Sequence, residues 1–126
     1  MEKPSIDNLF ANCDIEKYKN ILSSYSNDIN CWERLRARRY IDRHKELVLI
    51  INNWDKLNDS DKEFICGIRD ITIMGDGDTV RVGKIYNELD KQHWDDTLNS
   101  LNKIVEIKVK KQNAYNILTL IMSLLD

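Results

Sequence analysis

The feature that most constrains this fold is a long run of helical periodicity in the first half of the chain. Apolar residues recur every three or four positions from Ile29 to Trp54, and no glycine or proline interrupts them. This spacing places apolar side chains along one side of an α-helix, which must then pack against other elements. The sequence therefore predicts a dominant helix over 29–54, around which the rest of the chain is organised.

Shorter stretches with the same periodicity lie on both sides of this helix. Two short helices are expected before it, with Ser5 and Asp14 as their N-caps. A further helix is expected after Ser60, whose spacing to Glu63 matches a capping box, and it is predicted to end near Met74. Each of these segments is short, so each needs the others to bury its apolar side.

The second half of the chain allows two local structures at two places. The segments 80–82 and 105–109 fit a helix, but apolar and charged residues also alternate in them with the period of a strand. Helix is favoured, and a small two-stranded ribbon formed by these segments is the alternative. After these segments, the apolar run Ile117–Leu125 covers too much of a helix surface to face water, so it should either complete the core or meet a partner, including a second copy in a homodimer. The fold class predicted is all-α, a compact bundle of about six or seven helices in a single domain over 1–126.

Composition and charge limit the classes of partner. Lysine plus arginine number 19 and aspartate plus glutamate 21, for a net charge of -2, so the whole molecule has no general attraction to nucleic acid or to an anionic membrane. Charges interrupt every apolar run before it reaches membrane-spanning length, and the first residues do not match a signal peptide. A cytoplasmic protein with no membrane contact is expected, and the abundance of Ile, Asn and Lys hints at an AT-rich bacterial or phage gene.

Cysteine, histidine and tryptophan give no pattern that predicts catalysis or metal binding. The three cysteines and two histidines have no metal-ligand spacing, and no nucleophile motif surrounds them. Cys66 is interpreted as a buried thiol beside Phe64. The three tryptophans, Trp32, Trp54 and Trp94, are interpreted as core residues. Neither a cofactor nor a metal is expected, and the chain is not expected to be an enzyme.

The glycine-rich segment ITIMGDGDTVRV, residues 71–82, is the strongest candidate for chemistry. Asp76 and Asp78 are spaced as in an aspartate-based phosphotransfer site, but the chain lacks the length and the repeated strand–helix units that such a site needs. The segment also lacks the ligand spacing of a calcium loop and the glycine and hydroxyl pattern of a phosphate-binding loop. It is interpreted as a turn whose glycines supply positive φ and whose aspartates cap the next helix.

An arginine-rich stretch over 34–45 gives the chain a local positive charge. Residues 31–52 hold six basic and three acidic side chains, and on a helix Arg36, Arg39 and Arg43 share one face. Arginine makes bidentate contacts with phosphate, so this face could position a nucleic acid. The other interpretation is a solvated face whose arginines pair with acids elsewhere in the fold.

The segment 53–96 has the opposite charge, with eleven acidic and six basic residues. If these acids converge, they form a surface that steers a basic protein toward the chain. The acids expected to bind the partner are Asp55, Asp59, Asp61, Glu63, Asp76, Asp78, Glu88, Asp90, Asp95 and Asp96.

Small size, divided charge and the missing catalytic pattern together favour a binding protein. The function predicted is inhibition: an immunity protein or antitoxin whose acidic surface blocks a basic, nuclease-like toxin or effector. The alternative is a nucleic-acid-binding regulator that uses Arg36, Arg39 and Arg43.

Overall fold

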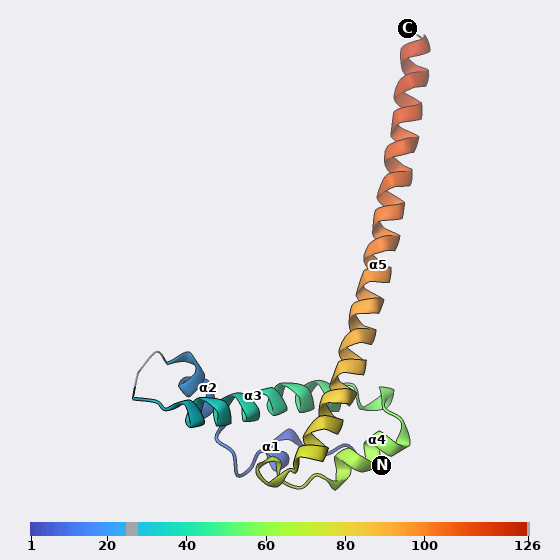
Figure 1. The fold of residues 1–126 in the computed structure, drawn as a ribbon. Helices are drawn as coiled ribbons and strands as arrows, with labels where there is room; N and C mark the ends of the chain where they lie inside the picture. Colours follow the sequence, from blue (N-terminus) through green and yellow to red (C-terminus); the bar gives the residue numbers. More distant parts are fainter. Residues whose placement is uncertain (25–27, 126) are drawn as a thin grey trace. The chain divides into compact units, whose positions relative to one another are not determined.

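The computed structural model describes residues 1–24 and 28–125, and helices make up most of this part (Figure 1). The all-α prediction is confirmed. The described residues form five α-helices and two short 3-10 helices, not six or seven α-helices, and they contain no strand. The α-helices are α1 (Ile6–Leu9), α2 (Ile15–Ser23), α3 (Cys31–Asn52), α4 (Asp59–Gly67) and α5 (Asp76–Leu125), and the 3-10 helices are η1 (Trp54–Lys56) and η2 (Ile71–Ile73).

The chain divides into two compact units. The first unit is Met1–Leu89 and the second is Asp90–Asp126. Helix α5 contributes to both, because its first turns belong to the first unit and its remaining turns are the second unit. Among the described residues, the buried core lies in the first unit, and the large apolar side chains of the second unit are exposed.

Side-chain caps fix where three of the helices begin. The Asp14 carboxylate accepts a hydrogen bond from the Lys17 backbone N–H at 3.1 Å, as the sequence predicted. Helix α3 begins after Asn30, which accepts from the Glu33 N–H at 2.9 Å. The prediction of a capping box at Ser60 is wrong. Because Asn58 has extended backbone and accepts from the Asp61 N–H at 2.8 Å, α4 begins two residues earlier than the box requires.

The core of the first unit lies along the apolar side of α3. Leu47 and Ile50 are fully buried there, and Ile65 of α4 and Val82 of α5 are fully buried against the same cluster. Burying a side chain of this size stabilises the fold by about 1.5–3 kcal/mol. The buried cluster comprises Leu9, Phe10, Leu47, Ile50, Ile51, Trp54, Leu57, Ile65, Ile68, Ile71, Val82, Ile85 and Leu89.

The segments 80–82 and 105–109, for which a ribbon was the alternative, are both helical in α5. At 80–82, the spacing of Val82, Ile85 and Leu89 buries one helical side against the core, and this burial outweighs the alternation. At 105–109 the alternating side chains are all exposed and no described strand pairs with them, so the backbone hydrogen bonds are made within the helix.

Several residues expected in the core are exposed instead. Trp32 and Trp94 are 75% and 58% exposed, while Trp54 is buried as predicted. Cys66 is exposed, although the preceding residue on α4, Ile65, is fully buried, because consecutive residues of a helix point in directions about 100° apart. The apolar run Ile117–Leu125 does not complete the core, since its large apolar side chains are all exposed.

The turn between α4 and α5 has a different backbone from the one expected. Helix α4 ends at Gly67 rather than near Met74, and η2 follows it. None of the four glycines has positive φ: Gly67 is the last residue of α4, Gly75 directly precedes α5, and Gly77 and Gly83 lie inside α5. The bend is held instead by Asp70, whose carboxylate accepts from the Thr72 N–H at 2.9 Å, from the Thr72 hydroxyl at 2.7 Å and from the Asn12 side-chain amide at 2.6 Å. These bonds lower the pKa of Asp70, first through Asn12 and then through Thr72.

Candidate functional site

Asp76 and Asp78 lie in the first turn of α5, where a carboxylate interacts favourably with the positive end of the helix dipole. Both side chains are exposed, and Asp76 pairs with Arg39 of α3 at 3.1 Å. Within 1–24 and 28–125, no group of three or more His, Cys, Asp or Glu side chains is arranged to hold a metal ion. Asp76 therefore joins α5 to α3, and both aspartates favour the start of the helix.

The three arginines proposed for nucleic-acid binding have different surroundings. Arg36 is exposed and has no ion pair with a described residue, and Arg39 pairs with Asp76. Arg43 donates two hydrogen bonds to the Glu46 carboxylate, at 2.8 and 2.7 Å, and its side chain is only 16% exposed. Of the three guanidinium groups, only that of Arg36 is both exposed and without an acidic partner in the described structure.

The ten acids proposed as a binding surface are divided between the two units. Asp61 pairs with Arg81 at 3.5 Å and Asp76 with Arg39, so bases lie among the acids at these two positions. Asp90 is half-buried. The remaining acids are exposed and have no ion pair with a described residue: Asp55, Asp59, Glu63, Asp78, Glu88, Asp95 and Asp96.

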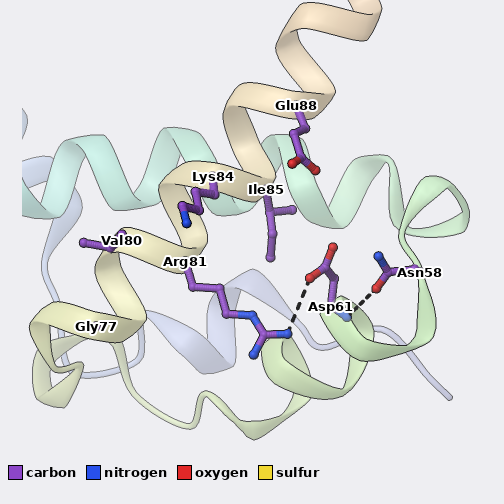
Figure 2. Close-up of a pocket in the computed structure, with 8 residues that line it drawn as sticks. All are labelled: Asn58, Asp61, Gly77, Val80, Arg81, Lys84, Ile85 and Glu88. Atoms are coloured by element: carbon purple, nitrogen blue, oxygen red, sulfur yellow. Dashed lines mark hydrogen bonds and ion pairs between the residues drawn. The ribbon is translucent and has the colours of Figure 1, made fainter.

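A pocket of about 460 Å³ lies between the start of α4 and the first turns of α5 (Figure 2). It is lined by Asn58, Asp61, Gly77, Val80, Arg81, Lys84, Ile85 and Glu88. Figure 2 shows Arg81 reaching from α5 to Asp61, with Lys84 and Glu88 further along the same helix. The lining contains charges of both signs, with Asp61 and Glu88 acidic and Arg81 and Lys84 basic.

Arg81 connects α5 to α4 in this pocket, a role that the sequence analysis did not find. Its guanidinium lies 4.5 Å from the centre of the Phe64 ring and donates to the Ser60 carbonyl at 3.3 Å and the Ser60 hydroxyl at 3.1 Å. These hydrogen bonds and the Asp61 pair are all made by one terminal nitrogen of the guanidinium, Nη2. Because all of its partners are distant in sequence, no local pattern could have identified the role of Arg81.

The second unit has an exposed apolar surface, which we call the Trp94 stripe: Trp94, Leu98, Leu101 and Val105. Their spacing of four, three and four residues places them on one side of α5. Between half and three fifths of each side chain is exposed. The sequence contained this stripe, but helical spacing does not say whether an apolar face is covered by its own chain, and Trp94 was therefore assigned to the core.

Acidic residues accompany the Trp94 stripe along the helix. Asp90 lies one turn before Trp94, and Asp95 and Asp96 follow it directly. Lys91 is the only lysine or arginine in 88–96, so this part of α5 carries a net negative charge. The stripe thus combines exposed apolar area with a negative field at one end, which are the two properties that protein-binding surfaces use for affinity and for association rate.

In the described part of the chain, no helix has a stretch long and apolar enough to cross a bilayer.

Comparison of the chain with models of protein families, with curated proteins and with solved structures finds no match. Its function is therefore argued from the geometry of the surfaces described above.

Proposed function

We propose that the chain is a non-catalytic protein-binding inhibitor, which blocks a basic, nuclease-like toxin or effector in the manner of an immunity protein or antitoxin. The observation that carries this proposal is the Trp94 stripe, an exposed apolar surface that begins within an acidic part of α5. Covering this stripe with a partner removes apolar area from water, and each side chain contributes in proportion to the area it buries.

Trp94 is the residue we expect to contribute most to affinity. Tryptophan is enriched among the few interface residues that dominate binding, because it buries a large area with little loss of side-chain freedom. Leu98 and Leu101 follow it along the same side of the helix and extend the contact. The contact then has the form of an amphipathic helix in an apolar groove of its partner.

The acids give the interaction its preference for a basic partner. Asp90, Asp95 and Asp96 attract positive charge, which increases the association rate at low salt and disfavours acidic partners. A nucleic-acid-cleaving toxin has a basic active site, and carboxylates placed there take the position of phosphates. The exposed acids of α4, Asp59 and Glu63, add to the negative field of the first unit.

Binding of nucleic acid by α3 has less support. Arg43 is held by Glu46 and Arg39 by Asp76, so a phosphate would have to replace these contacts. The arrangement favours the protein-binding proposal.

The test compares two exposed tryptophans. Full-length chain and its Trp94→Ala variant are used to capture proteins from the native host, with Trp32→Ala as the control because Trp32 is exposed in the first unit and lies outside the stripe. A basic protein is expected to bind the wild type and the control, and Trp94→Ala is expected to raise its Kd about 30-fold or more. The captured protein should also lose a growth-inhibiting or nucleic-acid-cleaving activity when it is bound. Capture that Trp94→Ala leaves unchanged, or a captured protein whose activity the chain does not reduce, would overturn the proposal.

A further inference from the structure

The polarity of α5 inverts along its length in the second unit. Eighteen residues are about five turns of an α-helix, so residues 18 positions apart lie on the same side. The residues 18 positions after the four members of the Trp94 stripe are Gln112, Asn116, Thr119 and Ser123. The side of the helix that is apolar over 94–105 is therefore polar over 112–123.

The polar groups on this later side are satisfied within their own helix. The Gln112 side-chain amide donates to the Asn116 side-chain oxygen at 3.0 Å. The Thr119 hydroxyl donates to the Tyr115 carbonyl at 3.0 Å, and the Ser123 hydroxyl donates to the Leu120 carbonyl at 2.8 Å. A surface whose polar groups already have partners gains little from a protein contact, so this side is suited to water.

Most of the opposite side of the helix inverts in the other direction. Asp96, Lys103 and Glu106 are charged, and the residues 18 positions after them are Ala114, Ile121 and Leu124. Ile107, 18 positions before Leu125, is the apolar exception. We call this later apolar surface the Leu118 face: Ala114, Ile117, Leu118, Ile121, Leu124 and Leu125, all exposed. The second unit thus has two apolar surfaces on opposite sides, and one partner helix lying along α5 cannot cover both.

We propose that the Leu118 face binds a second copy of the chain, with the two helices antiparallel. The face contains no charged residue, so nothing in it selects a charged partner. It is also self-complementary in this direction. When Leu118 lies opposite Ile121 of the second copy, Ala114 lies opposite Leu125, and Ile117 and Leu124 lie together on one flank of these pairs, so apolar side chains meet apolar side chains.

The charges beside the face determine the orientation. Lys111 lies one heptad before Leu118 on the same side of α5, and Lys108 and Lys110 are its neighbours. A parallel, in-register pair would bring Lys111 against Lys111 of the second copy, and the like charges would oppose association. The antiparallel pair separates the two lysine clusters to opposite ends of the contact.

Association is tested on the full chain by sedimentation equilibrium, with two aspartate substitutions two residues apart. Ile121→Asp places a charge in the Leu118 face and is expected to convert a dimer at micromolar concentration to a monomer. Thr119→Asp places the same charge on the polar side and should leave the dimer intact. A monomeric wild type, or equal loss of dimer in both variants, would overturn the proposal.

Orientation is tested by disulfide formation in a background with Cys13, Cys31 and Cys66 replaced by serine, after its helicity and sedimentation are shown to match those of the wild type. A mixture of Leu118→Cys and Ile121→Cys chains should form disulfide-linked dimers, and each variant alone should form few. Efficient linking of Leu118→Cys to itself would show a parallel pair and overturn the antiparallel arrangement. The outcome is separate from that of the inhibitor proposal, because Trp94→Ala should leave the dimer intact and Ile121→Asp should leave partner capture intact.

Discussion

Arg43 and Glu46, one turn apart on α3, are joined by two parallel hydrogen bonds of 2.8 and 2.7 Å, and their side chains are only 16% and 13% exposed. Charge-assisted bidentate bonds of this kind are the strong ones, and removal of one partner leaves the other charge largely desolvated. We expect Glu46→Ala to lower the free energy of unfolding by about 3 kcal/mol. Urea unfolding followed by circular dichroism measures the change.

The matched control for this prediction is the exposed pair Lys19–Glu16, which also spans one helical turn. Its side chains are 52% and 79% exposed, so Glu16→Ala should cost less than about 0.5 kcal/mol. Equal effects of the two substitutions would show that burial does not strengthen the Arg43–Glu46 pair. The double variant Arg43→Ala with Glu46→Ala should be less destabilised than the two single variants predict together.

His44 should make the stability of the first unit depend on pH. Burial lowers its pKa, Lys19 lowers it further, and Glu16 opposes this in part. Its ring also packs edge-on against Phe10, with ring centres 4.9 Å apart. Because the unfolded chain binds a proton at His44 more readily than the folded chain does, the contribution of His44 to stability is complete above its ordinary pKa of about 6.5 and is lost as pH falls toward the lower, folded-state pKa.

The measurement is the urea midpoint between about pH 7.5 and pH 5.5, a range chosen around the ordinary histidine pKa. The midpoint of the wild type should fall across this range, and His44→Gln should remove most of the decrease. His93→Gln is the control, since His93 is exposed in the second unit. A wild-type midpoint that stays level, or a decrease that persists in His44→Gln, contradicts the assignment.

The start of α4 should depend on Asn58 rather than on Ser60. Because the Asn58 side chain satisfies the Asp61 N–H, Asn58→Ala should destabilise the protein by about 1 kcal/mol. The control is Ser5→Ala, since Ser5 occupies the N-cap position of α1 without a side-chain hydrogen bond. Thermal unfolding measures both, and a loss at Ser5 as large as that at Asn58 would show that the cap bond is not the cause.

Features that depend on the spacing of neighbouring residues could be predicted from the sequence, and features that depend on backbone conformation or on distant contacts could not. The helix α3 was predictable, because its periodicity continues without a glycine or proline up to Asn52. The position of the α4 cap was not, because Asn58 and Ser60 both suit an N-cap and only the backbone conformation selects between them. The single-helix character of 76–125 was also hidden, since the alternation near Val105 is resolved only by the absence of a strand to pair with it.

For the candidate surfaces too, the sequence showed which residues are apolar or charged but not how folding arranges them. The residues of the Trp94 stripe were visible as apolar periodicity, and most of those of the Leu118 face as part of an apolar run. Their exposure was not visible, because exposure depends on what the rest of the fold covers. The contacts of Arg39 with Asp76 and of Arg81 with Asp61 join residues that are distant in sequence. Along the sequence, basic residues are concentrated in 31–52 and acidic residues in 53–96. These two pairs show that folding brings an acid and a base from different segments or helices together.

The three thiols should differ in reactivity, as their environments do. Cys31 and Cys66 are exposed, whereas Cys13 is half-buried against the core. Burial raises the pKa of Cys13, and the nearby carboxylates of Asp14 and Asp70 raise it further. Since the thiolate is the reactive form, Cys13 should react with a thiol reagent such as DTNB several-fold more slowly than the other two at neutral pH.

The progress curve of the wild type should therefore show two fast equivalents and one slow one, and Cys13→Ser should remove only the slow phase. In urea the three thiols should become equivalent, because unfolding removes the burial and separates Cys13 from Asp70. A fast phase that disappears in Cys13→Ser would mean that this thiol is open to solvent and would contradict the packing of Cys13 against the core.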